Sequence, residues 1–293
     1  MEKQIKTNTQ FYETVRVFFS RGVIVKICFG IIIFFVLVAI LAPIITPYTP
    51  TQQSLREALQ GSSGKYKLGT DHLGRDVLTR LMYGARISLL CSVLSSILSA
   101  ILGMVLGLIS GYFGGWIGQI IMRFVDAQLS IPPLVLSMVL AAAFVQIFGG
   151  NILAISLVIG LSRFATYVRV VNGLVLSLKQ NDFIVASTLL GQSNSKILIK
   201  HLLPNCFPSI IVLFTMNLGG AIMMESSLSF LGIGITPPTP AWGSMVSEGY
   251  TYLISNPSLA ILPGFCVLLL VMAFNIVGDG LRDALDPRLR GKL

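Results

Sequence analysis

The run ISLLCSVLSSILSAILGMVLGLI, residues 87–109, contains no charged side chain. A helix needs about 20 apolar residues to cross roughly 30 Å of hydrocarbon, so this run predicts a transmembrane helix. Further runs with few charges occupy residues 23–45, 120–148, 152–171, 209–233 and 259–277. The whole chain is 54% hydrophobic and 11% charged, far less charged than a soluble domain. We therefore predict an all-α membrane protein with six transmembrane helices.

Basic residues predict how these helices are oriented. Lys and Arg are frequent in residues 1–22, 172–207 and 278–293, whereas the segments after the third and fifth runs contain neither. Cytoplasmic loops carry the excess of positive charge, so we predict a multi-pass protein of the cell membrane with both termini cytoplasmic. The basic loop 46–85 is an exception to this pattern. The net charge of +9 then reflects topology, and we expect membrane lipid rather than nucleic acid as its partner.

A cleaved signal peptide is the alternative for the first run, because basic residues precede it. The run ends at Pro43 and a stretch rich in Pro and Thr rather than at a small-residue cleavage site, which favours a retained helix. The predicted organisation is a cytoplasmic segment 1–22, a first helix 23–45, an extracytoplasmic loop 46–85, a domain of five helices 86–277 and a cytoplasmic tail 278–293.

The extracytoplasmic loop ends in a pattern of helical spacing. Thr70 or Asp71 can cap a helix, and apolar residues then recur at positions 73, 77, 78, 81 and 82. This predicts an amphipathic helix on the outer membrane surface before the second span. Such a helix could fix the angle at which that span enters the membrane, or it could form a docking surface for an external partner.

Small residues and prolines mark two further helices. Gly103, Gly107 and Gly111 repeat every four residues, which lets a neighbouring helix approach closely, either within the chain or in a dimer. Pro132 and Pro133 interrupt the third run and predict a break, whether it moves or is a static kink.

Arg123, Asp126, Arg163 and Glu225 lie inside the apolar runs, where each charge is costly unless it is paired or hydrated. Arg123 and Asp126 are three residues apart on one helix and are predicted to pair with each other. Arg163 and Glu225 are candidates for a polar translocation path, with pairing to neighbouring helices as the alternative.

Motifs for catalysis are missing from the sequence. It has no G-x-x-x-x-G-K-[ST] and no C-x-x-C, and its two histidines fall on opposite sides of the predicted membrane. We therefore expect no catalytic, cofactor-binding or metal-binding residues, and a chain that is not an enzyme.

The segment 172–207 between the fourth and fifth runs is predicted to form a helix, a break at Gly191 and a second helix ended by Pro204. Such a unit can receive force from outside the chain. It resembles the cytoplasmic signature of binding-protein-dependent ABC importer permeases, which reads Glu-Ala-Ala, three residues, Gly, nine residues, Ile-x-Leu-Pro. The spacing is kept here as Val185-Ala186-Ser187, Gly191 and His201-Leu202-Leu203-Pro204, with Val185 and His201 departing from the pattern.

Other segments resemble the C-type permease of dipeptide, oligopeptide and nickel importers. They are LGTDHLGRDVLTRLMYGARISL at 68–89, GYFGGW at 111–116, ESSLSFLGIGITPPTPAWGSM at 225–245 and FNIVGDGLRDALDPRL at 274–289. The resemblance implies the type I ABC importer permease fold with a cytoplasmic coupling helix between spans four and five. It also implies an ATPase-coupling loop that includes Asp182, Val185, Ala186, Ser187, Gly191, His201, Leu203 and Pro204.

The resemblance further implies that the chain forms half of a pore for di- or oligopeptides. A homologous B-type permease would supply the other half, two ATP-binding subunits would use ATP and Mg, and an extracytoplasmic binding protein would deliver substrate. Nickel or a metal chelate is the alternative cargo. A secondary carrier or channel is a more distant alternative, because the sequence shows no clear internal repeat and no filter segment.

Overall fold

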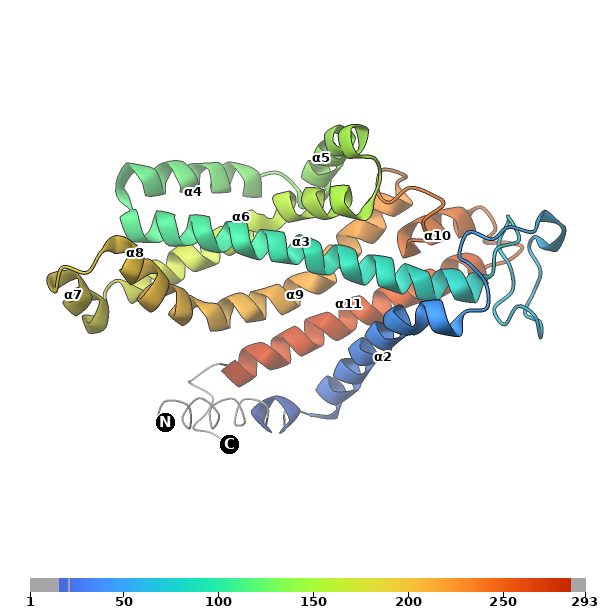
Figure 1. Ribbon diagram of the computed structural model, residues 1–293, viewed down its shortest axis with the longest axis horizontal. Coiled ribbons are helices and arrows are strands. Elements are labelled where there is room, and N and C mark those ends of the chain that lie inside the picture. Colours follow the sequence, from blue (N-terminus) through green and yellow to red (C-terminus); the bar gives the residue numbers. More distant parts are fainter. Residues whose placement is uncertain (1–15, 21, 286–293) are drawn as a thin grey trace.

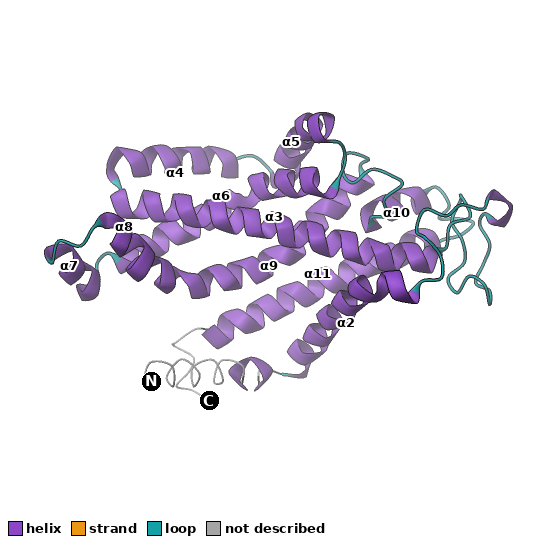
Figure 2. Cartoon of the chain, in the orientation of Figure 1, coloured by secondary structure: helices purple, strands orange, loops and turns teal. Residues whose placement is uncertain are grey.

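The computed structural model describes residues 16–20 and 22–285. That part of the chain consists of helices and loops, without a named strand (Figure 2). The remaining residues of the predicted segments 1–22 and 278–293 lie outside it. The main helices are α2 (Val23–Ile45), α3 (Val77–Phe113), α4 (Gly115–Leu129), α5 (Pro133–Phe148), α6 (Ile152–Leu178), α7 (Asp182–Leu189), α8 (Asn194–Ile197), α9 (Leu203–Phe230), α10 (Trp242–Tyr250) and α11 (Ser258–Leu285).

The long helices lie side by side along the long axis of the molecule (Figure 1). Five helices are long and apolar enough to cross a membrane: α2, α3, α6, the continuous helix Asn194–Phe230 that contains α8 and α9, and α11. The bent pair α4 and α5 makes a sixth candidate. These spans match the six that the hydropathy of the sequence predicts.

The third span is broken rather than straight. α4 and α5 meet at an angle of 97° across a short break. Pro133 is the first residue of α5, where its missing N–H costs no hydrogen bond, and it keeps Pro132 in an extended conformation (ψ 128°). The two prolines therefore end one helix and start another, as their positions predict.

The predicted amphipathic helix before the second span is wrong as a separate element. Residues 77–82 form the first turns of α3, which continues without interruption to Phe113. The helix is capped by Asp76, whose Oδ2 accepts from the Thr79 N–H at 2.8 Å, and not by Thr70 or Asp71. Gly74 prevents an earlier start, because its φ of +71° is left-handed and a Cβ at this position would lie only 1.9 Å from the Ser54 carbonyl oxygen.

The three glycines of α3 face α6 in the same chain. A Cβ on Gly107 would lie 2.6 Å from the Val171 Cβ, and one on Gly111 would lie 2.7 Å from the Val175 Cβ. Gly103 lies closer still to Tyr167. The glycines therefore serve packing between two helices of this chain, which is one of the two predicted alternatives. Each glycine faces the residue 64 positions later, so α3 and α6 run parallel to each other along this seam.

A larger side chain in this seam should destabilise the protein. We expect Gly107→Leu to lower the thermal unfolding temperature in detergent, since overpacking a close helix contact costs about 1–3 kcal/mol or more. Gly30→Leu in α2 is the matched control, because nothing lies within 4 Å of its Cβ position. Equal unfolding temperatures for the two variants would contradict the packing role.

The second helix of the inner segment does not end at Pro204. The chain is helical from Asn194 to Phe230, and a π-type turn, Leu198–Leu202, directly precedes the proline. Pro204 lies in the first turn of α9. Proline lacks an N–H, but the change to a wider hydrogen-bond spacing lets the helix continue past it. The predicted second helix and the fifth span are thus one element.

Candidate functional site: a coupling lever and an outer clamp

α7 projects at one end of the bundle, beyond the long helices (Figure 1). Ile184 attaches it, because this side chain is 3% exposed and packs in one cluster with Val175, Ile197 and Leu202. The opposite face is open and apolar: Leu189 and Leu190 are 83% and 80% exposed. A short helix with one anchored face and one free apolar face is suited to docking against another protein.

Gly191 ends α7 in a Schellman motif. Its N–H donates to the Thr188 carbonyl at 3.0 Å, and the Gln192 N–H donates to the Ser187 carbonyl at 3.2 Å. The motif requires a left-handed residue, and Gly191 has φ +70°. The glycine predicted to break the two helices therefore fixes the turn between them.

Polar contacts tie this turn, and the segment that precedes α7, to the long helices. The His201 Nε2 lies 3.1 Å from the Gln192 Oε1, which joins the residue after Gly191 to the following helix. The Tyr112 hydroxyl donates to Asn194 at 2.9 Å, and the Lys179 Nζ donates to the Tyr112 carbonyl at 2.6 Å. His201, where the family pattern has Ile, thus makes a polar contact that Ile could not make.

The other predicted coupling residues lie on the same unit. Asp182 begins α7, and Val185 and Ala186 are exposed on it. Ser187 is buried and donates to the Phe183 carbonyl at 2.7 Å. Leu203 and Pro204 start α9. Beside α7 a groove of about 430 Å³ is lined by Tyr112, Phe113, Lys179, Ile184, Val185, Thr188, Leu189 and Asn194.

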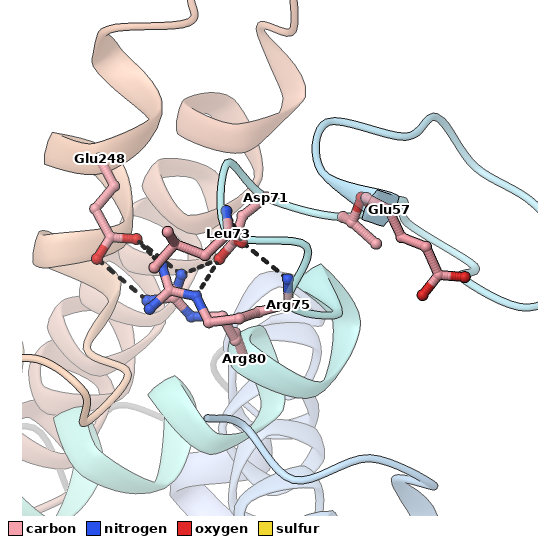
Figure 3. Close-up of polar contacts among 7 residues, drawn as sticks. Glu57, Asp71, Leu73, Arg75, Arg80 and Glu248 are labelled. Atoms are coloured by element: carbon pink, nitrogen blue, oxygen red, sulfur yellow. Dashed lines mark hydrogen bonds and ion pairs between the residues drawn. The ribbon is translucent and has the colours of Figure 1, made fainter. Parts of the chain in front are cut away.

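At the opposite end of the molecule, buried charges fasten the loop before α3. Asp71 accepts from the Arg75 Nε at 2.6 Å and also pairs with Arg80. Glu248 of α10 accepts from the Arg75 Nη2 at 2.7 Å and from the Arg80 Nη1 at 2.8 Å. Figure 3 shows both carboxylates converging on the two guanidinium groups, while Glu57 points away. We call Asp71, Arg75, Arg80 and Glu248 the outer clamp, after the predicted outer side of the loop 46–85.

The outer clamp is held together by charge in a largely dry environment. Both arginine side chains are 2% exposed. Burial alone would raise the pKa of Asp71, but the Arg75 backbone N–H and the charges of Arg80 and Arg75 lower that pKa below its ordinary value. The Asp71 Oδ1 also accepts from the Leu73 N–H at 2.9 Å, which fixes the turn that precedes α3.

Only one sign of this clamp is visible in the sequence: a basic loop on the predicted outer side. The partners are far apart in sequence, since Arg75 and Glu248 are 173 residues apart. Ligand atoms of Asp71, His72 and Glu248 lie within 4.8 Å of one another, an arrangement that could hold a metal ion. Two buried guanidinium groups already neutralise both carboxylates, so the local charge opposes a cation.

A second outer contact joins α3 to α10. Trp242 is fully buried, and its Nε1 donates to the Leu81 carbonyl at 2.9 Å. Its ring lies against Gly84, where a Cβ would lie 2.6 Å from the Trp242 Cδ1. Farther out, hydrogen bonds from Lys65 and Tyr66 hold the pKa of Glu57 at about 2. The outer loop is therefore a folded element attached to α3 and α10.

Arg163 and Glu225 both bond to neighbouring helices. Arg163 of α6 donates from its Nη2 to the Asn217 Oδ1 of α9 at 2.7 Å. Glu225 is fully buried between α3 and α9, where it accepts from the Ser88 and Ser229 hydroxyls at 2.8 Å each. Arg163 and Glu225 thus both bond to a neighbouring helix, as the alternative to a polar translocation path predicts.

The predicted pair between Arg123 and Asp126 is wrong. Asp126 pairs instead with Arg169 of α6, whose Nη2 lies 2.6 Å from its Oδ1. The side chains are 49% and 55% exposed respectively. The prediction of Arg123 rested on spacing along one helix. Because α4 packs against α6, Arg169 of α6 also lies within reach of Asp126.

Comparison with known proteins gives the family. Residues 103–291 match the model of the "Binding-protein-dependent transport system inner membrane component", and residues 9–61 match the "N-terminal TM domain of oligopeptide transport permease C". The dipeptide transport system permease protein DppC of Escherichia coli (strain K12) is 45% identical over 278 residues, which cover 92% of this chain and 90% of that protein.

Two further proteins agree. The glutathione transport system permease protein GsiD of Salmonella typhimurium is 40% identical over 274 residues, covering 93% of this chain and 89% of that one. Among solved structures, a chain of the inward-facing MetNI methionine ABC transporter has the same fold, with a TM-score of 0.56 at 20% identity, covering 70% of this chain and 96% of that chain. This chain therefore belongs to the family of binding-protein-dependent transport system inner membrane components, and it is a permease subunit of an ABC importer.

Proposed function

We propose that this chain forms half of the translocation pore of an ATP-driven importer for di- or oligopeptides. The observation that carries the proposal is α7, a short helix outside the bundle with an exposed apolar face and a fixed Schellman turn. The relatives named for dipeptide and glutathione transport favour a peptide cargo. The chain itself has no ATP-binding motif, so force must come from a partner.

The proposed partners follow from this division of work. A homologous B-type permease completes the pore, two ATP-binding subunits hydrolyse ATP with Mg, and an extracytoplasmic binding protein delivers substrate. One of the two ATP-binding subunits docks on α7 of this chain. The chain contributes no catalytic residue. Closure of the ATPases pushes α7, and contacts at its base pass the displacement to α3 and α6.

The proposed orientation places both termini and α7 in the cytoplasm of a cell-membrane protein. In support, the start of α2 and the end of α11 lie toward the same end of the molecule as α7 (Figure 1). The side chains of Val25 and Ala284 belong to one buried cluster at that end. The outer clamp then faces the binding protein, and the predicted exception to the basic-residue pattern is explained by internal ion pairs.

Uptake by the reconstituted complex tests this proposal. We expect proteoliposomes that contain both permeases, both ATPases and the binding protein to accumulate a labelled dipeptide only with ATP, and to show no comparable uptake of Ni²⁺. Liposomes with the two permeases alone should accumulate neither. Peptide flux through the permeases alone would support a carrier or channel, and ATP-dependent uptake of Ni²⁺ but not of peptide would support the nickel alternative.

A further inference from the structure

Arg163 places a positive charge in the central part of a membrane span. It lies eleven residues after Ile152, the first residue of α6, and fifteen residues before Leu178, the last. The helical rise puts it about 17 Å from one end of α6 and about 23 Å from the other. The hydrocarbon layer is roughly 30 Å thick, so both headgroup regions are distant. A charge at this depth is costly unless an opposite charge or water meets it.

The guanidinium of Arg163 is held in place by α9. Its Nη2 and Nε both donate to the Asn217 Oδ1, at 2.7 Å and 3.3 Å. The Asn217 amide is oriented in turn by its own helix, because its Nδ2 donates to the Leu213 carbonyl at 2.8 Å. Gly220 leaves the space for the guanidinium, since a Cβ there would lie 2.6 Å from the Nη2. Asn217 is neutral, so it orients the charge without cancelling it.

Within the part of the chain that the structure describes, no ion pair includes Arg163. The two carboxylates of the predicted spans are engaged elsewhere: Asp126 pairs with Arg169, and Glu225 bonds to serine hydroxyls. The acidic residues outside the described part belong to the two terminal segments that are predicted to be cytoplasmic. The Arg163 side chain is partly exposed, so a group from outside the chain can reach it.

A cleft of about 530 Å³ leads toward Arg163 between α6 and α9. Its lining is mostly apolar and includes Val170 and Leu213. Val170 lies two turns from Arg163 along α6 in the direction of α7, and Leu213 lies one turn from Asn217 along α9 in the same direction. Arg282 of α11 lines the cleft near the inner end of that helix. This surface therefore fits a membrane helix with apolar side chains and one acidic residue at the depth of Arg163.

We propose that the second permease covers this face of α6 and α9, and that a carboxylate from one of its membrane helices pairs with Arg163. The inference rests on the proposed function, which requires a second permease. Lipid headgroups are too distant to supply the anion, and a passing peptide would leave the charge unbalanced between transport cycles. The bonds to Asn217 use Nε and Nη2, so a carboxylate can accept from Nη1.

Recovery of the second permease with this chain tests the proposal. Both permeases are produced together, this chain carries an affinity tag, and the amount of second permease recovered per tagged chain is measured. Arg163→Met should reduce this ratio by about tenfold or more, because it leaves a buried carboxylate of the partner unpaired. Methionine enters the bilayer more favourably than arginine, so the variant chain itself should still be inserted. Arg163→Lys keeps the charge and should retain about half of the recovery or more.

Arg169→Met is the matched control. It makes the same substitution six residues farther along α6, but the charge of Arg169 is balanced within this chain by Asp126. That pair is half-exposed, and exposed pairs contribute little to stability. The second permease should therefore be recovered with Arg169→Met at close to the unsubstituted ratio.

A second substitution identifies the partner carboxylate. In complexes with Arg163→Met, each Asp or Glu in the predicted spans of the second permease is replaced in turn by Asn or Gln. One replacement should restore recovery, because it removes the charge that Arg163→Met leaves unpaired. Failure of every replacement would overturn the proposal, as would normal recovery with Arg163→Met. If such a normally assembled complex also loses peptide uptake, Arg163 serves the translocation path instead. An unsubstituted chain that recovers no second permease would contradict the proposed function itself.

Discussion

Gly191→Pro abolishes ATP-driven uptake, while the chain is still inserted and assembled, if α7 is the part that the ATPases push. Proline requires φ near −65°, whereas Gly191 has φ +70°, and proline cannot donate the hydrogen bond to the Thr188 carbonyl. The Schellman turn is then lost, and α7 no longer holds its angle to the following helix. The rate of uptake by reconstituted complexes should fall by about tenfold or more. This corresponds to an increase of at least about 1.4 kcal/mol in the activation free energy of transport.

Gly191→Asn is the control at the same position. Asparagine is the residue after glycine that most readily adopts the left-handed conformation, and it keeps the N–H. We therefore expect uptake within about twofold of the unsubstituted complex, which corresponds to a few tenths of a kcal/mol. Normal uptake by Gly191→Pro would refute the coupling role of this turn, and equal loss in both variants would mean that the glycine itself, not its conformation, is required.

Arg80→Ala should release the outer loop. The substitution leaves Asp71 and Glu248 with one buried guanidinium instead of two, and removing one partner of a buried pair costs about 3–5 kcal/mol. Glu248 is 22% exposed, so water will offset part of this cost, and the lower end of that range is expected. Trypsin added to the outer side should then cut the loop rapidly at Lys65 or Lys67, which a fastened loop resists.

Arg56→Ala is the matched control for the outer clamp. It removes a guanidinium from the same loop, but Arg56 lies outside the clamp and is exposed. Substitutions at exposed positions usually change stability by no more than about 0.5 kcal/mol, so the cleavage rate should stay near that of the unsubstituted chain. Equal protease resistance of Arg80→Ala and the unsubstituted chain would show that the loop is fastened by something other than its ion pairs.

Local signals in the sequence predicted much of the fold. Unbroken apolar runs predicted the spans, Pro132 and Pro133 predicted the break in the third, and Gly191 predicted a turn between two helices. Each of these depends on residues close together in the chain. The start of α3 was mispredicted because Leu73 continues the helical spacing, while the left-handed Gly74 ends it, and spacing does not report backbone conformation.

Contacts between distant segments could not be predicted. Asp126 pairs with Arg169, 43 residues away, although Arg123 has the ideal spacing along its own helix. The outer clamp joins Arg75 to a carboxylate 173 residues away, and the family resemblance covered both segments without indicating that they meet. Such pairs follow from how helices pack, which a pattern along one helix does not contain.

α3 has a mechanical consequence that follows from its length. At 37 residues it measures about 55 Å, almost twice the thickness of a hydrocarbon layer. Arg80 near its start belongs to the outer clamp, and Tyr112 near its end bonds to Asn194, three residues after the Gly191 turn that ends α7. A rigid rod pinned at both ends cannot tilt at one end alone. In the proposed importer, a single helix therefore carries the force of an ATPase from one membrane face to the surface where substrate arrives at the other.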